Sequence, residues 1–69
     1  MSDNVYKHIQ LTGTSSKGIE DAVNTALSRA AKTVHNMRWF EIVETRGSID
    51  GGKVQEWQTT IRVGFTLND

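Results

Sequence analysis

The sequence predicts an α+β domain with the element order β-α-β-β, in which a three-stranded antiparallel sheet curls around one helix. Three observations predict this fold class. Three segments alternate apolar and polar residues at period two, as half-buried strands do. The segment after the first strand repeats apolar residues every three or four positions, as an amphipathic helix does. A pair of glycines separates the last two strand-like runs, so we expect a hairpin there and a single domain over residues 1–69.

The first strand and the helix occupy the N-terminal half of the chain. Val5 to Thr12 alternates in polarity, and the Gly-Thr-Ser-Ser run at 13–16 ends this strand. The helix is expected from Ile19 to Val34, with one apolar stripe about four turns long. The stripe consists of Ile19, Ala22, Val23, Ala26, Leu27, Ala30, Ala31 and Val34. Ser15 or Ser16 can accept hydrogen bonds from the first free backbone amides, which fits a helix start here.

The second strand is expected from about Met37 to Thr45 and the third from about Lys53. The turn between them carries Gly51 and Gly52, which supply the positive φ of tight turns. Strict alternation predicts one face with Phe40, Ile42, Trp57, Ile61, Val63 and Phe65, and the other face with Trp39, Glu41, Val43, Thr45, Gln58 and Arg62. We expect the helix to bury the first of these faces and to leave the second open.

Trp39 and Phe40 are adjacent, so a regular strand sends them to opposite faces of its sheet. Phe40 can enter the core under the helix. One helix cannot cover both faces, and the face that carries Trp39 must therefore be covered by a ligand or by another chain.

Composition excludes several other classes of protein. The eight basic and eight acidic residues cancel and form no basic block, which argues against a nucleic-acid binder. Cysteine is absent, and His8 and His35 alone do not predict a structural zinc site. No apolar run is long enough to span a bilayer and no signal-peptide pattern is present, so we expect a cytoplasmic protein. A domain this small needs oligomerisation or a bound ligand for stability.

An ordered set of residues across nearly the whole chain is similar to a known family. The set comprises Val5-Tyr6-Lys7, Gly13-Thr14-Ser15, Gly18, the alanine-rich helix, Arg38-Trp39-Phe40-Glu41, Arg46-Gly47, Gln58 and Val63-Gly64-Phe65. With these residues the chain resembles the dodecins, small flavin-storage proteins of bacteria and archaea. The resemblance implies a β-α-β-β fold and a hollow homododecamer. It also implies a pair of flavins at each two-fold interface, stacked between two tryptophans.

The resemblance gives roles to three residues, and each also has a plainer interpretation. Trp39 would stack on the flavin, although tryptophan is also common in dry subunit interfaces. Gln58 would meet the N–H and C=O groups of the flavin pyrimidine ring, although a strand glutamine is often only solvated. Arg46, with Lys7 or Arg62 as alternatives, would supply charge for a phosphate. Strict alternation places Arg46 on the Phe40 face, so its reach to the ligand would need a bulge, a bend or a second subunit.

The chain also departs from the family pattern. Many bacterial members have an arginine directly after Val-Gly-Phe, where this chain has Thr66. The missing charge weakens the expectation of phosphate recognition, so riboflavin is kept as the alternative, while FMN remains our first expectation. It also weakens the expectation of bound coenzyme A, which some bacterial relatives hold.

We expect a storage and photoprotection protein and no catalysis, because no nucleophile has a recognisable base and orienting acid. The rival hypotheses are a flavoenzyme and a structural homo-oligomer with Trp39 in a dry interface.

Overall fold

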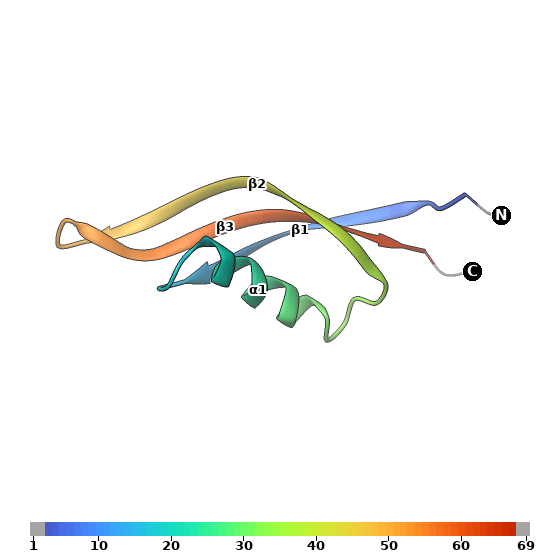
Figure 1. Cartoon of the computed structure of the whole chain (residues 1–69), viewed down its shortest axis with the longest axis horizontal. Coiled ribbons are helices and arrows are strands. Elements are labelled where there is room, and N and C mark those ends of the chain that lie inside the picture. The colour runs from blue at the N-terminus through green and yellow to red at the C-terminus, as the bar shows by residue number, and fades with distance from the viewer. Residues whose placement is uncertain (1–2, 68–69) are drawn as a thin grey trace.

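The computed structural model describes residues 3–67 and confirms the predicted fold class. Its elements are β1 (Tyr6–Ser15), α1 (Ile19–Ala30), β2 (Met37–Asp50) and β3 (Lys53–Thr66). The sheet order is β1-β3-β2, and β3 pairs antiparallel with both of its neighbours. Figure 1 shows α1 crossing one face of this curved sheet, while no other element of residues 3–67 covers the opposite face. The opposite face is called the open face below.

The core lies between α1 and the two strands β1 and β3, against which the helix packs. Ile61 and Val63 of β3 are fully buried, and they contact Val23 and Ala26 on the helix. Partly buried apolar side chains surround this cluster: Ile9, Leu11, Leu27 and Met37. The apolar residues of β1 and β3 and the helical stripe therefore meet as their periodicities predict.

The helix approaches β1 very closely at Gly13. A Cβ at this position would overlap the backbone carbonyl of Ala22 and would lie 3.0 Å from the Cβ of Ala26. The short side chains on this part of the stripe allow the same close approach. Gly13 is thus a packing residue in the strand itself, and not only a part of the turn that was expected to end the strand near position 12.

Hydrogen bonds of Ser15 connect the end of β1 to the start of α1. Its hydroxyl donates to Oδ2 of Asp21 at 2.6 Å and accepts the backbone N–H of Lys17 at 2.9 Å. Gly18 occupies the N-cap position and has no side-chain cap. The expected serine contact with free amides is present, but it acts on the turn before the helix.

The helix is shorter than the apolar stripe predicts. It ends at Ala30, and the chain continues in turns in which Val34 N–H donates to the carbonyl of Ala30 at 2.8 Å. Asn36 has a φ of 65°, in the left-handed region that asparagine tolerates better than most residues. The β-branched Thr33 and Val34 disfavour another helical turn. The chain therefore turns back toward the sheet early enough to begin β2 at Met37.

Phe40 and Ile42 lie on the helix side of the sheet, as predicted, but the expected burial is wrong. Phe40 is 46% exposed and Ile42 is 51% exposed. Because α1 lies over β1 and β3, the β2 part of this face remains uncovered. An apolar groove of about 420 Å³ runs between α1 and β2 and is lined chiefly by Ile19, Val23, Leu27, Phe40 and Ile42.

The β2–β3 hairpin is longer than expected, since β2 continues past Thr45 to Asp50. Asp50 pairs with Lys53, and both turn residues, Gly51 and Gly52, have positive φ values of 60° and 77°. Two positive φ values define the tight turn that matches the twist of the strands. Figure 1 shows this hairpin extending well beyond the helix, as a two-stranded arm.

Candidate functional site

A β-bulge in β2 decides which side chains share the open face. Ile42 lies opposite Ile61, but the next aligned pair is Glu44 with Thr60, so Val43 is an extra residue. Relative to strict alternation, the bulge reverses the faces of the residues that follow it, as far as the next irregularity after Ser48. Thr45 lies opposite the buried Thr59, on the helix side, and its predicted place on the Trp39 face is wrong.

The same bulge corrects the expectation for Arg46. Strict alternation puts this arginine on the Phe40 face, whereas the observed register pairs it directly with Gln58. Gln58 alternates with the inward-facing Thr59 and Ile61, so Gln58 and Arg46 both lie on the open face. Trp39 lies on this face too, opposite Gly64. All three predicted site residues therefore share one surface of the sheet.

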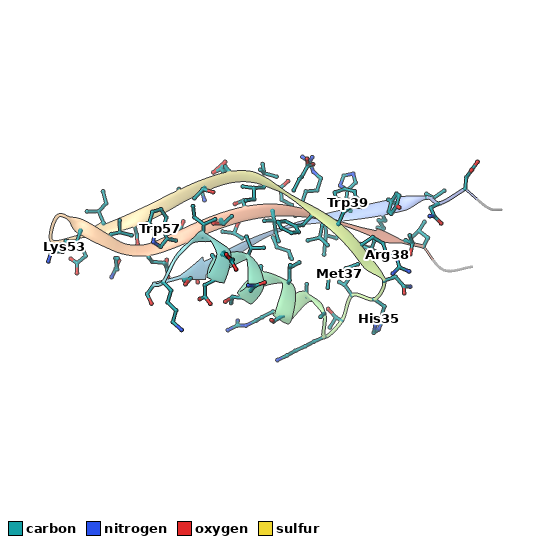
Figure 2. All side chains as sticks on the ribbon, viewed as in Figure 1. His35, Met37, Arg38, Trp39, Lys53 and Trp57 are labelled. Atoms are coloured by element: carbon teal, nitrogen blue, oxygen red, sulfur yellow. The ribbon has the colours of Figure 1, made fainter. Side chains whose placement is uncertain are left out.

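They do not form a single cluster within one chain. Trp39 is aligned with Gly64, and Arg46 with Gln58. These two positions of β3 are about 20 Å apart at a rise of about 3.3 Å per residue. Figure 2 shows Trp39 well separated along the sheet from Trp57, the neighbour of Gln58. The open face carries an aromatic site at one end and a polar site at the other.

At the aromatic site, the indole of Trp39 extends from β2 across β3. A Cβ on Gly64 would lie 2.6 Å from Nε1 of Trp39 and closer still to two of its ring carbons, so the indole lies directly over this glycine. Tyr6 of β1 meets Trp39 edge-on, with ring centroids 6.0 Å apart and planes at 63°. Trp39 remains 38% exposed. The indole is held in place, and part of it is free for another flat group.

Gly64 and Tyr6 were not assigned roles from the sequence. For Gly64 a signal does exist, because a glycine inside a regularly alternating strand often marks a close approach by another group. Tyr6 gave no signal of its own, since its contact with Trp39 depends on strand pairing across β3.

Replacing Gly64 by alanine is expected to displace the indole of Trp39 without unfolding the chain. The new methyl group would occupy the place of the ring, and the ring is a surface side chain that can move. The measurement is the indole N–H resonance of each tryptophan by NMR. We expect the Trp39 resonance to shift strongly and that of Trp57, on the helix side, to stay in place. Gly18→Ala is the matched control, because a Cβ there meets nothing within 4 Å. An unchanged Trp39 resonance in Gly64→Ala would contradict the packing of the indole over Gly64.

At the polar site, Arg46 and Gln58 each contact an acidic residue two positions earlier on their own strand. Arg46 forms an ion pair with Glu44. The Nε2 group of Gln58 donates to Oε1 of Glu56 at 3.1 Å. Two carboxylates, those of Glu44 and Glu56, thus lie beside the two polar groups predicted to bind a ligand. The sequence analysis assigned no role to either carboxylate.

The two alternative cations occupy different surfaces. Arg62 lies on the open face between the aromatic and polar sites and pairs with Glu41. Lys7 lies opposite Phe65, on the helix side, and so does not belong to this surface. Thr66, the residue directly after Val63-Gly64-Phe65, lies opposite Tyr6 at the aromatic end.

The open face therefore offers a flat aromatic surface, a guanidinium and an amide, which suit a planar ligand with hydrogen-bonding edges. Residues 3–67 contain no group of three or more histidine, cysteine or acidic side chains arranged to hold a metal ion. Within the same residues, no helix has the length and apolar character needed to cross a bilayer.

Comparison with solved structures places this β-α-β-β fold among the dodecins. Dodecin from Streptomyces davaonensis superimposes with a TM-score of 0.94 at 40% identity, over 99% of this chain and 100% of that chain. A tryptophan-to-phenylalanine variant of Thermus thermophilus dodecin gives a TM-score of 0.92 at 43% identity, over 97% and 100% of the two chains. Two further solved variants of that protein each replace one arginine by alanine.

Sequence comparison agrees. The family model for dodecin matches residues 5–68. The Thermus thermophilus dodecin is 46% identical over 65 residues, which are 94% of either chain. This chain belongs to the dodecin family. Dodecins are small flavin-binding proteins that form oligomers and are generally non-catalytic.

Proposed function

We propose that this protein stores and buffers flavin and protects it from light, by stacking paired flavins between the Trp39 side chains of two subunits. The observation that carries the proposal is the seating of Trp39 over Gly64, which leaves the indole partly exposed on an otherwise uncovered sheet face. An exposed, fixed aromatic ring is a stacking surface for a planar ligand. Family membership supplies the identity of that ligand.

The separation of Trp39 from Gln58 supports a site shared by two subunits. About 20 Å along β3 is more than the three fused rings of a flavin can bridge. A two-fold axis that passes through the open face between the two sites would bring the aromatic site of one subunit close to the polar site of its partner, because a two-fold interface uses the same surface twice. In this arrangement Gln58 and Arg46 serve a flavin that is stacked on the partner's Trp39.

Self-association is supported by the uncovered apolar surface on the other side of the sheet. Phe40 and Ile42 line the groove beside α1, and the hairpin arm exposes Ile49 and Val54. Side chains of this kind are normally covered in a stable protein. Because dodecins form oligomers, we propose that copies of this chain cover these surfaces in a homododecamer. The cytoplasmic location stays a prediction.

FMN is the proposed ligand, with riboflavin as the alternative. The solved Thermus thermophilus variants change a tryptophan and two arginines, the first arginine seven positions after the tryptophan and the second twenty positions later. In this chain the same spacings lead from Trp39 to Arg46 and then to Thr66. Only one of the two cations remains, which leaves Arg46 as the group to bind a phosphate. Bound coenzyme A is correspondingly less expected.

The proposed photoprotection works by electron transfer. An indole stacked on an excited flavin donates an electron before the flavin can fluoresce or react, and the charge then returns, so that the light energy is released as heat. The mechanism requires contact between the two rings, which the exposed surface of Trp39 permits. Stacking on both faces would also block hydride transfer to the ring, which argues against a flavoenzyme.

The test is a titration of FMN and of riboflavin with the purified protein. We expect flavin fluorescence to be strongly quenched, and the dissociation constants to rank the two ligands. Mass spectrometry of any ligand released on denaturation identifies the natural one. Fluorescence that persists at saturating protein would refute the proposal and would favour a structural oligomer with Trp39 in a dry interface.

A further inference from the structure

We propose that Glu56 is a positioning residue that fixes the orientation of the Gln58 side-chain amide for ligand recognition. The proposal deepens the proposed function and rests on it. Glu56 and Gln58 lie two residues apart on β3, so their side chains leave the same face of the sheet. Their hydrogen bond, from Nε2 of Gln58 to Oε1 of Glu56, is 3.1 Å long and partly buried.

The chemical reason lies in the near symmetry of a primary amide. The oxygen and nitrogen ends of glutamine are almost the same size, so an unconstrained amide can present either end to a ligand. An ionised carboxylate only accepts hydrogen bonds. Glu56 therefore pairs with the NH₂ end alone and selects one of the two orientations.

The orientation leaves a defined recognition edge. One N–H of Gln58 is used by Glu56, while the second N–H and the carbonyl oxygen remain as a neighbouring donor and acceptor. This pair is complementary to an imide edge, in which an N–H lies beside a C=O, as in the pyrimidine ring of a flavin. If the amide rotated by half a turn, its NH₂ group would face the imide N–H, and its oxygen would face the imide carbonyl. Both hydrogen bonds to the imide edge would then be lost.

The neighbouring charges support this assignment of Glu56. Arg46 lies directly opposite Gln58, but its ion pair is with Glu44 on its own strand. Glu56 instead lies opposite Ser48, whose hydroxyl donates to Oε1 of Gln55. Glu44 thus contacts the guanidinium of Arg46, and Glu56 contacts the amide of Gln58. Each carboxylate is paired with a different group that we propose binds the ligand.

The test compares Glu56→Gln and Glu56→Ala with the unaltered protein, using riboflavin and N3-methylriboflavin as probes. The methyl group removes the N–H of the imide edge. For riboflavin we expect affinity to fall about fivefold in both variants, the size of one misplaced hydrogen bond. For N3-methylriboflavin we expect all three proteins to bind equally. Quenching at saturation stays unchanged, because stacking on Trp39 is untouched.

Controls separate positioning from a general loss of structure. Glu20→Gln removes the same charge from α1 and should leave both affinities unchanged. In a Gln58→Ala background, Glu56→Ala should cause no further loss of riboflavin affinity. A loss that is equal for both probes, or no loss for riboflavin, would overturn the proposal.

A measurement without flavin keeps this proposal distinct from the proposed function. The Gln58 side-chain NH₂ resonances are recorded by NMR in the ligand-free protein. We expect them to shift in Glu56→Ala and to stay in place in Glu20→Gln. If they do not respond to Glu56→Ala, the positioning role is refuted. If they respond but the unaltered protein fails to quench flavin, the proposed function is what has failed.

Discussion

Replacing Trp39 by alanine is expected to remove most of the quenching of flavin fluorescence and to weaken flavin binding by about 2 kcal/mol or more, a factor of about thirty. The indole is the only part of Trp39 that a flavin can stack on, and the variant leaves just the backbone of Gly64 beneath the ligand. The measurement is the same fluorescence titration, together with sedimentation to check assembly.

Trp57→Phe is the matched control for this experiment. Trp57 lies on the helix side of β3, next to Gln58 but facing away from it, so its replacement should leave quenching intact. Retention of full quenching by Trp39→Ala would show that the flavin stacks elsewhere. Loss of the oligomer in the same variant would instead indicate that Trp39 serves a dry contact between subunits.

Replacing Gly13 by alanine is expected to destabilise the fold by about 3 kcal/mol or more. The added methyl group would overlap the carbonyl oxygen of Ala22, and neither partner can move aside, since one is strand backbone and the other helix backbone. The helix would have to lift away from β1, and the buried contacts of Ala26 and Val23 would be lost with it. For a small domain this is a large share of the total free energy of unfolding.

Thermal unfolding followed by circular dichroism, at one fixed protein concentration, measures the effect. Gly18→Ala is again the matched control, because Gly18 has an extended φ of 164° and open space around it. We expect that variant to lose no more than about 1 kcal/mol, the cost of alanine at an N-cap. Equal melting temperatures for Gly13→Ala and the unaltered protein would contradict the close approach of α1 to β1.

Much of this architecture could be predicted because local pattern and global fold agree. Trp39 and Phe40 were assigned to opposite faces by period two alone, and both lie on their predicted faces. The hairpin turn followed from Gly51 and Gly52, which both adopt positive φ. These features depend on residues close together in the chain, where sequence carries the physical signal directly.

The features that could not be predicted depend on contacts between distant residues. The position of Arg46 follows from a bulge at Val43, and a bulge is set by pairing with β3 and has no fixed composition. The exposure of Phe40 follows from where α1 lies across the sheet, which periodicity does not specify. The roles of Glu44 and Glu56 follow from their side-chain contacts with Arg46 and Gln58, which neither composition nor strand alternation specifies.

The bulge at Val43 also has a consequence for the site. It divides β2 into two segments whose inward and outward positions are set independently, one carrying Trp39 and the other carrying Arg46. Because Val43 is the extra residue, its deletion would leave Glu44 opposite Thr60 and Arg46 on the open face. Regular pairing of Val43 with Thr60, in contrast, would turn Thr45 outward and Arg46 under the sheet, while Trp39 stayed in place. A change in strand pairing, without any substitution, is thus enough to uncouple the capture of a flat ring from the recognition of its charged or hydrogen-bonding end.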